Sequence, residues 1–242
     1  MKNNLDEHVK AYEHQSIFDF DNEIMLNWYP RRVIQLVSNI NVVLELGLGH
    51  GFSTNIFAEH FKKHLVLEGS QAVINNFKKN FSDCKADIIK TYFEDFKSNL
   101  RFDAIIMGFV LEHVSDPAKI LNMYKKFLAP SGKVFIAVPN AEVLNRRLGY
   151  IAGMLSDMHQ LSENDLLLGH KRFYTVNSIA EQIYESGYEI EKMEGIYLKP
   201  FTTEQIISLN FDPKIINALC QVGINYPELS CGILAVLKIK NN

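Results

Sequence analysis

The residues best suited to chemistry form a glycine-rich turn between a predicted strand and a predicted helix. Residues 42–46 form an apolar run, and glycines then follow at alternate positions, Gly47, Gly49 and Gly51. Because glycine has no Cβ, the backbone of such a turn can approach a ligand closely. Residues 52–58 continue at helical spacing, and the free N–H groups at a helix start suit a polar ligand. The turn predicts a cofactor site.

A second motif follows about one helix later along the chain. Residues 65–68 form a short apolar run that ends in Glu68. One helix and a return to the sheet would place this carboxylate beside the glycine turn, where it can accept hydrogen bonds from both hydroxyls of a ribose. The glycine spacing differs from the dinucleotide fingerprint, because one residue instead of two separates the second glycine from the third. The two motifs together indicate a nucleoside site.

Together these motifs resemble those of the class I S-adenosylmethionine-dependent methyltransferases. The segment from Glu45 to Gly51 matches the first motif of that family, and Glu68 matches its ribose-binding acid. Further similar segments follow in the family's order. They are the adenine-contacting segment 92–95, the fourth strand 102–107, the LEHV-DP helix start 111–117, the turn 128–134 and the segment 170–175. The resemblance covers residues from about 30 to about 195.

The resemblance implies which residues hold S-adenosylmethionine. The glycine turn would pack against the methionine portion, Glu68 would hold the ribose, and the segment around Tyr92 would contact the adenine. The implied cofactor-binding residues are Glu45, Gly47, Gly49, Gly51, Glu68, Gly69, Ser70, Tyr92, Phe93, Glu94, Gly108 and Phe109.

Two histidines, His113 and His170, lie in segments that match the family near the expected pocket mouth. We predict that His170 is the general base, because an imidazole near its unperturbed pKa can accept a hydroxyl proton. An equally open interpretation is that His170 only holds its loop in place. His113, which is expected to pack beside the cofactor, is the second candidate, and His159 and His14 are weaker ones.

Basic side chains in the same segments are candidates for binding the acceptor. The predicted acceptor-binding residues are Arg147, Arg172 and Tyr174. Guanidinium groups there would suit an anionic acceptor, although solvent-facing charge is the usual alternative. We predict no metal ion, because the acids at 157, 163 and 165 near His159 show no ligand spacing.

Composition and missing motifs narrow the class of acceptor. The net charge of −3 and pI of about 6.2 leave no basic footprint for nucleic acid. The fourth predicted strand is followed by residues 108–111, Gly-Phe-Val-Leu, and not by the Asn/Asp-Pro-Pro-Tyr signature of amino-methylating enzymes. The three widely spaced cysteines fit a reducing cytoplasm, and neither an apolar leader nor a membrane-spanning run is evident. We therefore expect a cytoplasmic enzyme acting on a small molecule.

Apolar runs that alternate with helical segments predict an α/β fold. Seven strands are expected, at 42–46, 65–68, 87–90, 103–107, 133–138, 187–195 and 232–238. The resemblance implies a Rossmann-like, mostly parallel sheet with helices on both faces and the last strand antiparallel at the edge.

Three stretches fall outside this alternation, and their apolar content favours ordered caps. We predict an N-terminal helical lid at 1–30, before a helix at about 31–38. The methyltransferase domain would span 31–242, with cap insertions at about 141–172 and 200–229. The second insertion is predicted to form two short helices around Asp212.

The sequence thus predicts transfer of a methyl group from S-adenosylmethionine to a small-molecule acceptor by a monomer or homodimer. Oxygen is the favoured acceptor atom, in a sugar, carboxylate, phosphonate or phenol. Three alternatives stay open: N- or C-methylation, a nicotinamide-dependent oxidoreductase, and a non-catalytic protein that binds S-adenosylmethionine.

Overall fold

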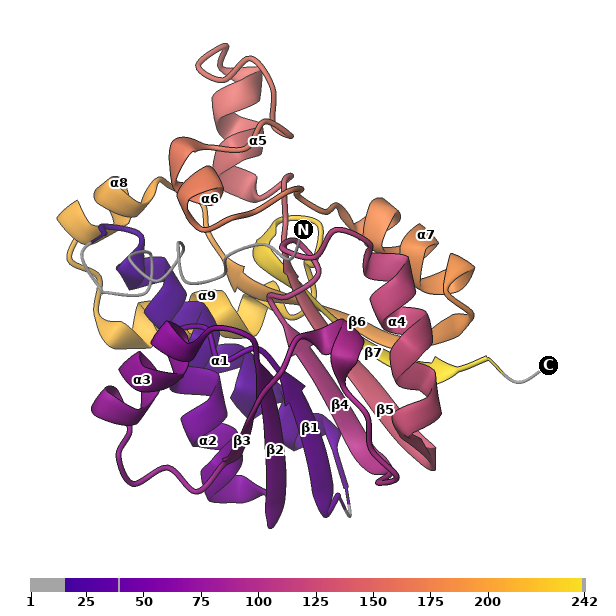
Figure 1. The fold of residues 1–242 in the computed structure, drawn as a ribbon. Helices are drawn as coiled ribbons and strands as arrows, with labels where there is room; N and C mark the ends of the chain where they lie inside the picture. Colours follow the sequence, from indigo (N-terminus) through magenta and orange to yellow (C-terminus); the bar gives the residue numbers. More distant parts are fainter. Residues whose placement is uncertain (1–15, 39, 241–242) are drawn as a thin grey trace.

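A single seven-stranded sheet organises the protein (Figure 1). The computed structural model describes residues 16–38 and 40–240. The strands lie in the order β3-β2-β1-β4-β5-β7-β6. Their bounds are β1 (Val42–Leu46), β2 (Lys63–Glu68), β3 (Asp87–Lys90), β4 (Phe102–Gly108), β5 (Leu128–Pro139), β6 (Tyr188–Leu198) and β7 (Ser230–Ile239). The first five strands pair in parallel, and β7 pairs antiparallel with both β5 and β6. This confirms the Rossmann-like, mostly parallel sheet with an antiparallel last strand.

The expectation that the last strand forms the sheet edge is wrong. β7 lies between β5 and β6, with Leu237 paired to Val134 on one side and to Ile190 on the other. The sequence explains this position, because residues 232–237 of β7 are all buried, as in a strand covered on both faces. β6 carries charged residues over 189–192 and tolerates the solvent-facing edge better.

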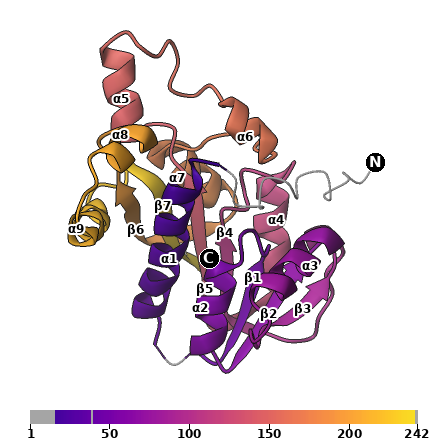
Figure 2. The same cartoon turned by 90° about the vertical axis from the view of Figure 1, so that its left-hand side faces the viewer.

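Helices cover both faces of the sheet (Figures 1 and 2). Their bounds are α1 (Asp19–Leu36), α2 (Phe52–His60), α3 (Gln71–Asn80), α4 (Pro117–Tyr124), α5 (Leu144–Ile151), α6 (Glu163–Leu167), α7 (Val176–Glu185), α8 (Thr203–Ser208) and α9 (Pro213–Gly223), with short 3₁₀ turns η2 (Phe93–Asp95) and η3 (Lys125–Phe127). Apolar side chains of α1, α2, α8 and α9 join one core cluster, and those of α4 and α7 join the cluster on the opposite face.

The N-terminal helix begins earlier than the sequence suggested. We expected a helix at about 31–38, but α1 starts at Asp19 and continues through Pro30 to Leu36. Proline usually marks a helix boundary, because it lacks an N–H and restricts the residue before it. Here Tyr29, Pro30 and Val33 are all buried in the interface with the sheet, so tertiary packing overrides that local signal. Residues 1–15 of the predicted lid, with His14, lie outside the described residues.

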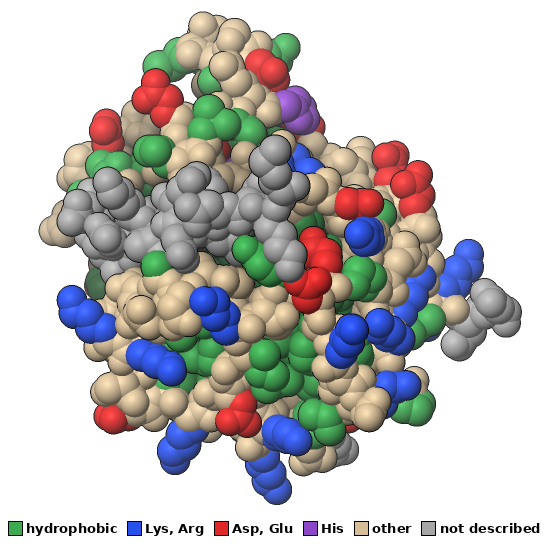
Figure 3. Space-filling model, in the orientation of Figure 1, with side chains coloured by type: hydrophobic (Ala, Val, Ile, Leu, Met, Phe, Trp, Pro, Cys, Tyr) green, Lys and Arg blue, Asp and Glu red, His purple; other side chains and the backbone are tan. Residues whose placement is uncertain are grey.

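Both predicted cap insertions contain helices. α5 and α6 lie between β5 and α7, and α5 extends away from the sheet at the top of Figure 1. Hydrophobic side chains are visible on this part of the surface in Figure 3. At the end of α5 and just after it, Ile151 is 82% exposed and Met154 is 86% exposed. The two short helices predicted around Asp212 are confirmed as α8 and α9. None of the helices in the described part of the chain is both long and apolar enough to cross a membrane.

Candidate active site

A cavity of about 710 Å³ opens at the carboxyl ends of the parallel strands. This is where open α/β sheets bind ligands, and the volume is typical of a small-molecule site. Residues that follow five strands in turn contribute to its wall. Those strands are β1, β2, β3, β4 and β5, and the residues include Gly47, Leu48, Gly49, Glu68, Gly69, Ser70, Thr91, Tyr92, Phe109 and Asn140. Helices α1, α5 and α6 add residues from the lid and the first cap.

The three glycines of the turn after β1 all have left-handed backbone conformations, with φ of +81° at Gly47, +48° at Gly49 and +86° at Gly51. Their surroundings differ. A Cβ at Gly51 would lie 2.6 Å from the ring of Phe77, so packing against α3 requires this glycine. A Cβ at Gly49 would meet no atom within 4 Å, and Gly49 lines the cavity. The turn therefore leaves space for a ligand at Gly49 and fits against the protein at Gly51.

Glu68 stands at the cavity wall, where the sequence placed it. Its Oε2 accepts a hydrogen bond from the N–H of Leu48 (3.1 Å), and its Oε1 accepts one from the N–H of Ser70 (2.8 Å). The side-chain oxygen of Ser70 in turn accepts from the N–H of Val73 and caps α3. These bonds fix the carboxylate between the glycine turn and the start of α3, in a geometry suited to the hydroxyls of a ribose.

Glu45 lies away from the cavity, unlike most of the predicted cofactor residues. Among the described residues it belongs to the buried set behind the cavity wall. Its carboxylate accepts hydrogen bonds from the hydroxyls of Ser53 (3.2 Å) and Thr54 (2.8 Å), and His64 Nε2 lies 3.0 Å from its Oε2. Glu45 thus joins β1 to the first turn of α2 and β2 and supports the glycine turn from behind.

The remaining predicted cofactor residues line the cavity from β3, η2 and β4: Tyr92, Phe93, Glu94, Gly108 and Phe109. Gly108 allows close packing, because a Cβ there would lie 2.2 Å from the hydroxyl oxygen of Tyr29. Phe109 has a φ of +56°, which non-glycine residues rarely adopt, and its N–H donates to Ala137. Such conformations concentrate at binding sites.

A polar cluster forms another part of the cavity wall. It contains Glu112 and His113, from the turn after β4, and His170, from the loop before α7; their ligand atoms all lie within 4.8 Å of one another. The rings of His113 and His170 meet edge to face, with centroids 4.7 Å apart. Asp165 Oδ1 lies 3.1 Å from His170 Nδ1. Both predicted catalytic histidines are therefore brought together.

Two acids at this cluster, Glu112 and its neighbour Asp165, were not predicted as site residues. Glu112 is completely buried, and neither of its carboxylate oxygens has a hydrogen-bond partner within the described part of the chain. Burial raises the pKa of Glu112 to about 7, against the opposing effect of His170. Burial acts in the same direction on Asp165, but hydrogen bonds with His170 and Ser162 lower the pKa of this carboxyl.

The helix that follows this cluster starts later than expected. Glu112 and His113 were predicted to begin it, but α4 starts at Pro117, with the side chain of Asp116 accepting a hydrogen bond from the N–H of Lys119 (2.9 Å). An acidic N-cap followed by proline at the first helical position is a strong start signal. The two residues therefore lie in a turn that faces the cavity.

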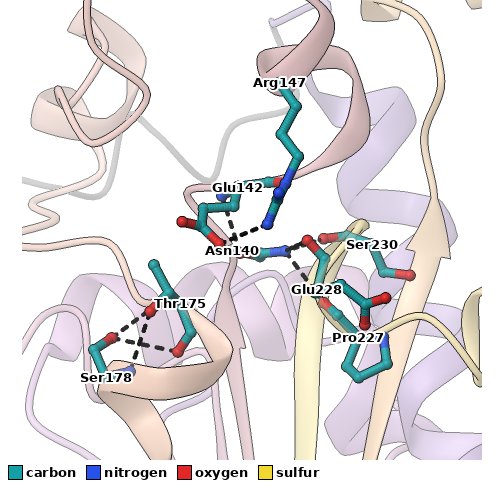
Figure 4. Close-up of polar contacts among 8 residues, drawn as sticks. All are labelled: Asn140, Glu142, Arg147, Thr175, Ser178, Pro227, Glu228 and Ser230. Carbon is teal, nitrogen blue, oxygen red and sulfur yellow. Dashed lines mark hydrogen bonds and ion pairs between the residues drawn. The ribbon is translucent and has the colours of Figure 1, made fainter. Parts of the chain in front are cut away.

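The three predicted acceptor-binding residues lie outside the cavity lining in the described structure. Arg147 donates to the carbonyl (2.8 Å) and the carboxylate (2.7 Å) of Glu142 (Figure 4). Arg172 donates to the carbonyl of Ser115 (3.4 Å). The buried hydroxyl of Tyr174 donates to the side-chain oxygen of Gln182 (2.9 Å).

The basic residues next to them in sequence line the cavity in their place: Arg146 and Lys171. Arg146 donates to the carbonyl of Met158 through Nε (3.0 Å) and lies 5.0 Å above the ring of Phe173. Arg146 and Arg147 are consecutive on α5 and so point in different directions, which the sequence pattern alone did not resolve.

Asn140 joins the two cap insertions at the end of β5. Its side-chain nitrogen donates to the carbonyls of Pro227, Glu228 and Ser230, and its side-chain oxygen accepts from the N–H of Glu142 (Figure 4). Since Asn140 also lines the cavity, its hydrogen bonds connect both cap insertions to the cavity wall.

A buried ion pair closes another part of the cavity wall. Lys199 Nζ lies 2.5 Å from Asp21 Oδ2, and the hydroxyl of Thr203 donates to the same oxygen. Asp21 belongs to α1 and Thr203 to α8, so the pair joins the N-terminal helix to the second cap insertion. No sequence signal linked these distant positions.

The fold and the cavity together define a Rossmann-like, nucleoside-cofactor-binding class of protein. The family model described as a methyltransferase domain matches residues 25–193, which is more than half of the chain. The chain therefore belongs to the methyltransferase-domain family.

Individual relatives are distant. Over 116 residues the chain is 28% identical to a ubiquinone biosynthesis O-methyltransferase of Parvibaculum lavamentivorans, covering 46% of this chain and 43% of that protein. The chain thus spans less than half the length of that relative. A protein of the same name from Acinetobacter baumannii is 21% identical over 209 residues, covering 84% of this chain and 86% of the relative.

Solved structures share the fold at low identity. The N-methyltransferase NodS from Bradyrhizobium japonicum, in complex with S-adenosylhomocysteine, matches with a TM-score of 0.62 at 12% identity, covering 99% of this chain and 100% of that one. The plantazolicin methyltransferase BpumL, in complex with a desmethyl analogue and S-adenosylhomocysteine, matches with a TM-score of 0.58 at 16% identity, covering 98% and 89%.

Proposed function

We propose that this protein transfers a methyl group from S-adenosylmethionine to an oxygen of a small-molecule acceptor. The observation that carries the proposal is that one cavity contains both the glycine turn with Glu68 and the cluster of Glu112, His113 and His170. The first half suits the cofactor and the second suits an acceptor hydroxyl. The names of the O-methyltransferase relatives support oxygen as the acceptor atom.

S-Adenosylmethionine is assigned to the strand-end half of the cavity. Glu68 holds the ribose hydroxyls, residues 92–94 contact the adenine, and the backbone at Gly47 and Gly49 lies against the methionine portion. The complexes of similar folds with S-adenosylhomocysteine support this choice of cofactor. Glu45 and Gly51 act indirectly, by holding the turn in shape.

The reaction we propose is a single displacement. An electron pair of the acceptor oxygen forms a bond to the methyl carbon, the carbon–sulfur bond breaks, and sulfur keeps its electrons as S-adenosylhomocysteine leaves. The hydroxyl proton passes to Nε2 of His170, whose Nδ1 is held by Asp165. His113 packs edge to face against His170 and is the second candidate base. Holding both reactants in one enclosed cavity supplies much of the rate enhancement.

The lid and cap insertions are proposed to bind the acceptor and exclude water. Arg146 and Lys171 line the cavity and present positive charge to it. Contacts of Arg147, Arg172 or Tyr174 with the acceptor would require the cap to move, because each of them is bonded elsewhere. The LEHV-DP segment favours the small-molecule branch of the family, and a cytoplasmic monomer or homodimer stays our prediction.

The test combines methyl transfer with cofactor binding. We expect labelled methyl groups to pass from S-adenosylmethionine to an oxygen of a member of a panel of phenols, carboxylates and sugars. His170→Ala should lower kcat by roughly 10²–10⁴-fold with unchanged S-adenosylhomocysteine affinity. His159→Ala, which changes an exposed histidine of the same cap, is the matched control.

Other results would redirect the proposal. S-Adenosylhomocysteine should raise the melting temperature and NAD should not. Stabilisation by NAD alone would favour the oxidoreductase alternative. Transfer to nitrogen or carbon only would contradict the oxygen assignment, and loss of turnover in His113→Ala but not in His170→Ala would exchange the two histidine roles.

A further inference from the structure

The polar cluster in the cavity has the composition of a metal site. One carboxylate and two imidazoles converge there from segments far apart in the sequence, with ligand atoms within 4.8 Å of one another. A backbone hydrogen bond from the N–H of Lys171 to the carbonyl of Glu112 (2.8 Å) fixes the two segments side by side. The relative positions of Glu112, His113 and His170 therefore belong to the fold and do not depend on flexible side chains alone.

Glu112 is the most informative member of the cluster. It is completely buried, and its two carboxylate oxygens have no hydrogen-bond partner among the described residues. Buried carboxylates are normally hydrogen-bonded, paired with a charge or bound to a metal, because desolvating an isolated one is costly. A cation held by this carboxylate and its two histidine neighbours would meet that requirement.

His170 also has the outer support typical of a metal ligand. Metal-binding histidines usually place their second ring nitrogen against a carboxylate, which fixes the orientation of the ring. Asp165 Oδ1 lies 3.1 Å from His170 Nδ1, which leaves Nε2 as the ligand atom. Asp165 is itself held by the capping box of α6, in which its side chain accepts from the N–H of Ser162 (2.8 Å).

We propose that Glu112, His113 and His170 together bind one divalent transition-metal ion of the Zn²⁺ type. Two imidazoles and one carboxylate match the preference of zinc for nitrogen and oxygen ligands, with the cavity side open for a further oxygen ligand. Bonds of about 2.0–2.2 Å put ligand atoms roughly 3.4 Å apart, so the side chains need to close by up to about 1.4 Å.

This inference goes beyond the proposed methyl transfer, because ion binding does not depend on turnover. It also has a consequence for that reaction. An ion at the cluster occupies the Nε2 lone pair of His170, so the ion-bound and ion-free forms differ in the group that activates the acceptor oxygen.

The experiment is a titration of the full chain, freed of metal by chelation and saturated with S-adenosylhomocysteine, with Zn²⁺ by calorimetry and with Co²⁺ by visible absorption. We expect one ion per chain. Glu112→Gln and His113→Ala should each weaken binding at least about tenfold, and Asp165→Asn roughly 10–100-fold. His159→Ala, at an exposed histidine, should leave the affinity unchanged.

The inference is overturned if the wild-type chain binds no ion, or if the ion binds equally well to Glu112→Gln and His113→Ala. Weaker binding by His159→Ala would also overturn it, because the ion would then lie elsewhere. The same samples report binding of S-adenosylhomocysteine. Loss of that binding with an intact ion site contradicts the proposed function alone, whereas intact binding without an ion contradicts this inference alone. Binding of S-adenosylhomocysteine by a variant also shows that this variant is folded.

Discussion

Replacing each of two glycines in the same turn by alanine should rank the two variants in opposite orders for stability and for cofactor binding. Gly49 and Gly51 both have left-handed backbones, with φ of +48° and +86°. The added methyl group meets nothing within 4 Å at Gly49, but at Gly51 it lies 2.6 Å from a ring carbon of Phe77 and 2.7 Å from one of Phe81. The first change therefore affects the cavity and the second affects the packing of α3 against α2.

The structure sets the sizes of these effects. At Gly49, alanine must adopt a left-handed conformation, which lowers the free energy of unfolding by about 1–2 kcal/mol. At Gly51 overpacking against two phenylalanine rings adds about 1–3 kcal/mol to that cost. Each kcal/mol corresponds to roughly 2–4 °C in melting temperature for a chain of this size. Gly51→Ala should therefore melt several degrees below Gly49→Ala.

Cofactor binding should show the reverse order. In Gly49→Ala the methyl group occupies space that we assign to the methionine portion, so affinity for S-adenosylhomocysteine should fall at least about tenfold, or 1.4 kcal/mol. Gly51→Ala, where it remains folded, should bind within a few-fold of the wild type. Thermal unfolding and calorimetry measure both quantities. Wild-type affinity in Gly49→Ala would refute the placement of the cofactor against this turn.

Two further predictions concern buried carboxylates. Glu68→Ala should weaken binding of S-adenosylhomocysteine by about 2–4 kcal/mol in calorimetry, because the charge-assisted bonds to the ribose are lost; unchanged affinity in a folded variant would exclude the ribose role. The second concerns Glu194, which accepts two hydrogen bonds from Arg32 of α1, at 3.0 and 2.8 Å. Burial alone would raise the pKa of Glu194, but the bonds from Arg32, together with that from Lys192, lower it below its ordinary value of 4.5. A lowered folded pKa stabilises the protein above the unfolded value, and that stabilisation is lost as the pH falls through the folded pKa. Glu194→Gln should thus lower the free energy of unfolding by about 1.5–3 kcal/mol at pH 7. In urea titrations the difference should shrink below pH 4.5, and a constant difference would contradict the ion pair's role.

Much of the sheet could be predicted because strand identity is a local property here. All seven predicted segments became strands, and most of them are continuous hydrophobic runs of the kind that a sheet covered on both faces requires. The position of β7 was missed for a different reason. Its buried run, including Leu234 and Leu237, was compatible with a central strand, but the order of strands depends on pairing across the chain. The run alone does not specify which neighbours it pairs with.

The start of α1 shows a local signal that tertiary packing overrides. Pro30 predicted a boundary, yet the helix continues because Tyr29 and Val33 bury their side chains against α2 and the sheet. That burial outweighs the missing hydrogen bond, which a sequence window around Pro30 does not reveal.

The meeting of Glu68 and the glycine turn at the cavity could be predicted, whereas the cluster of Glu112, His113 and His170 depends on how distant loops meet. Glu68 and the glycine turn follow consecutive strands of one α/β unit, so their meeting at the sheet end is a consequence of topology. Glu112 and His170 belong to loops after β4 and before α7, and the hydrogen bond between the N–H of Lys171 and the carbonyl of Glu112 brings them together. Asp165 joins them from α6, where its Oδ1 lies 3.1 Å from His170 Nδ1. An isolated histidine in the sequence predicts a base. A histidine beside a buried carboxylate whose oxygens have no hydrogen-bond partner predicts a cation site. Only the three-dimensional structure distinguishes these two environments.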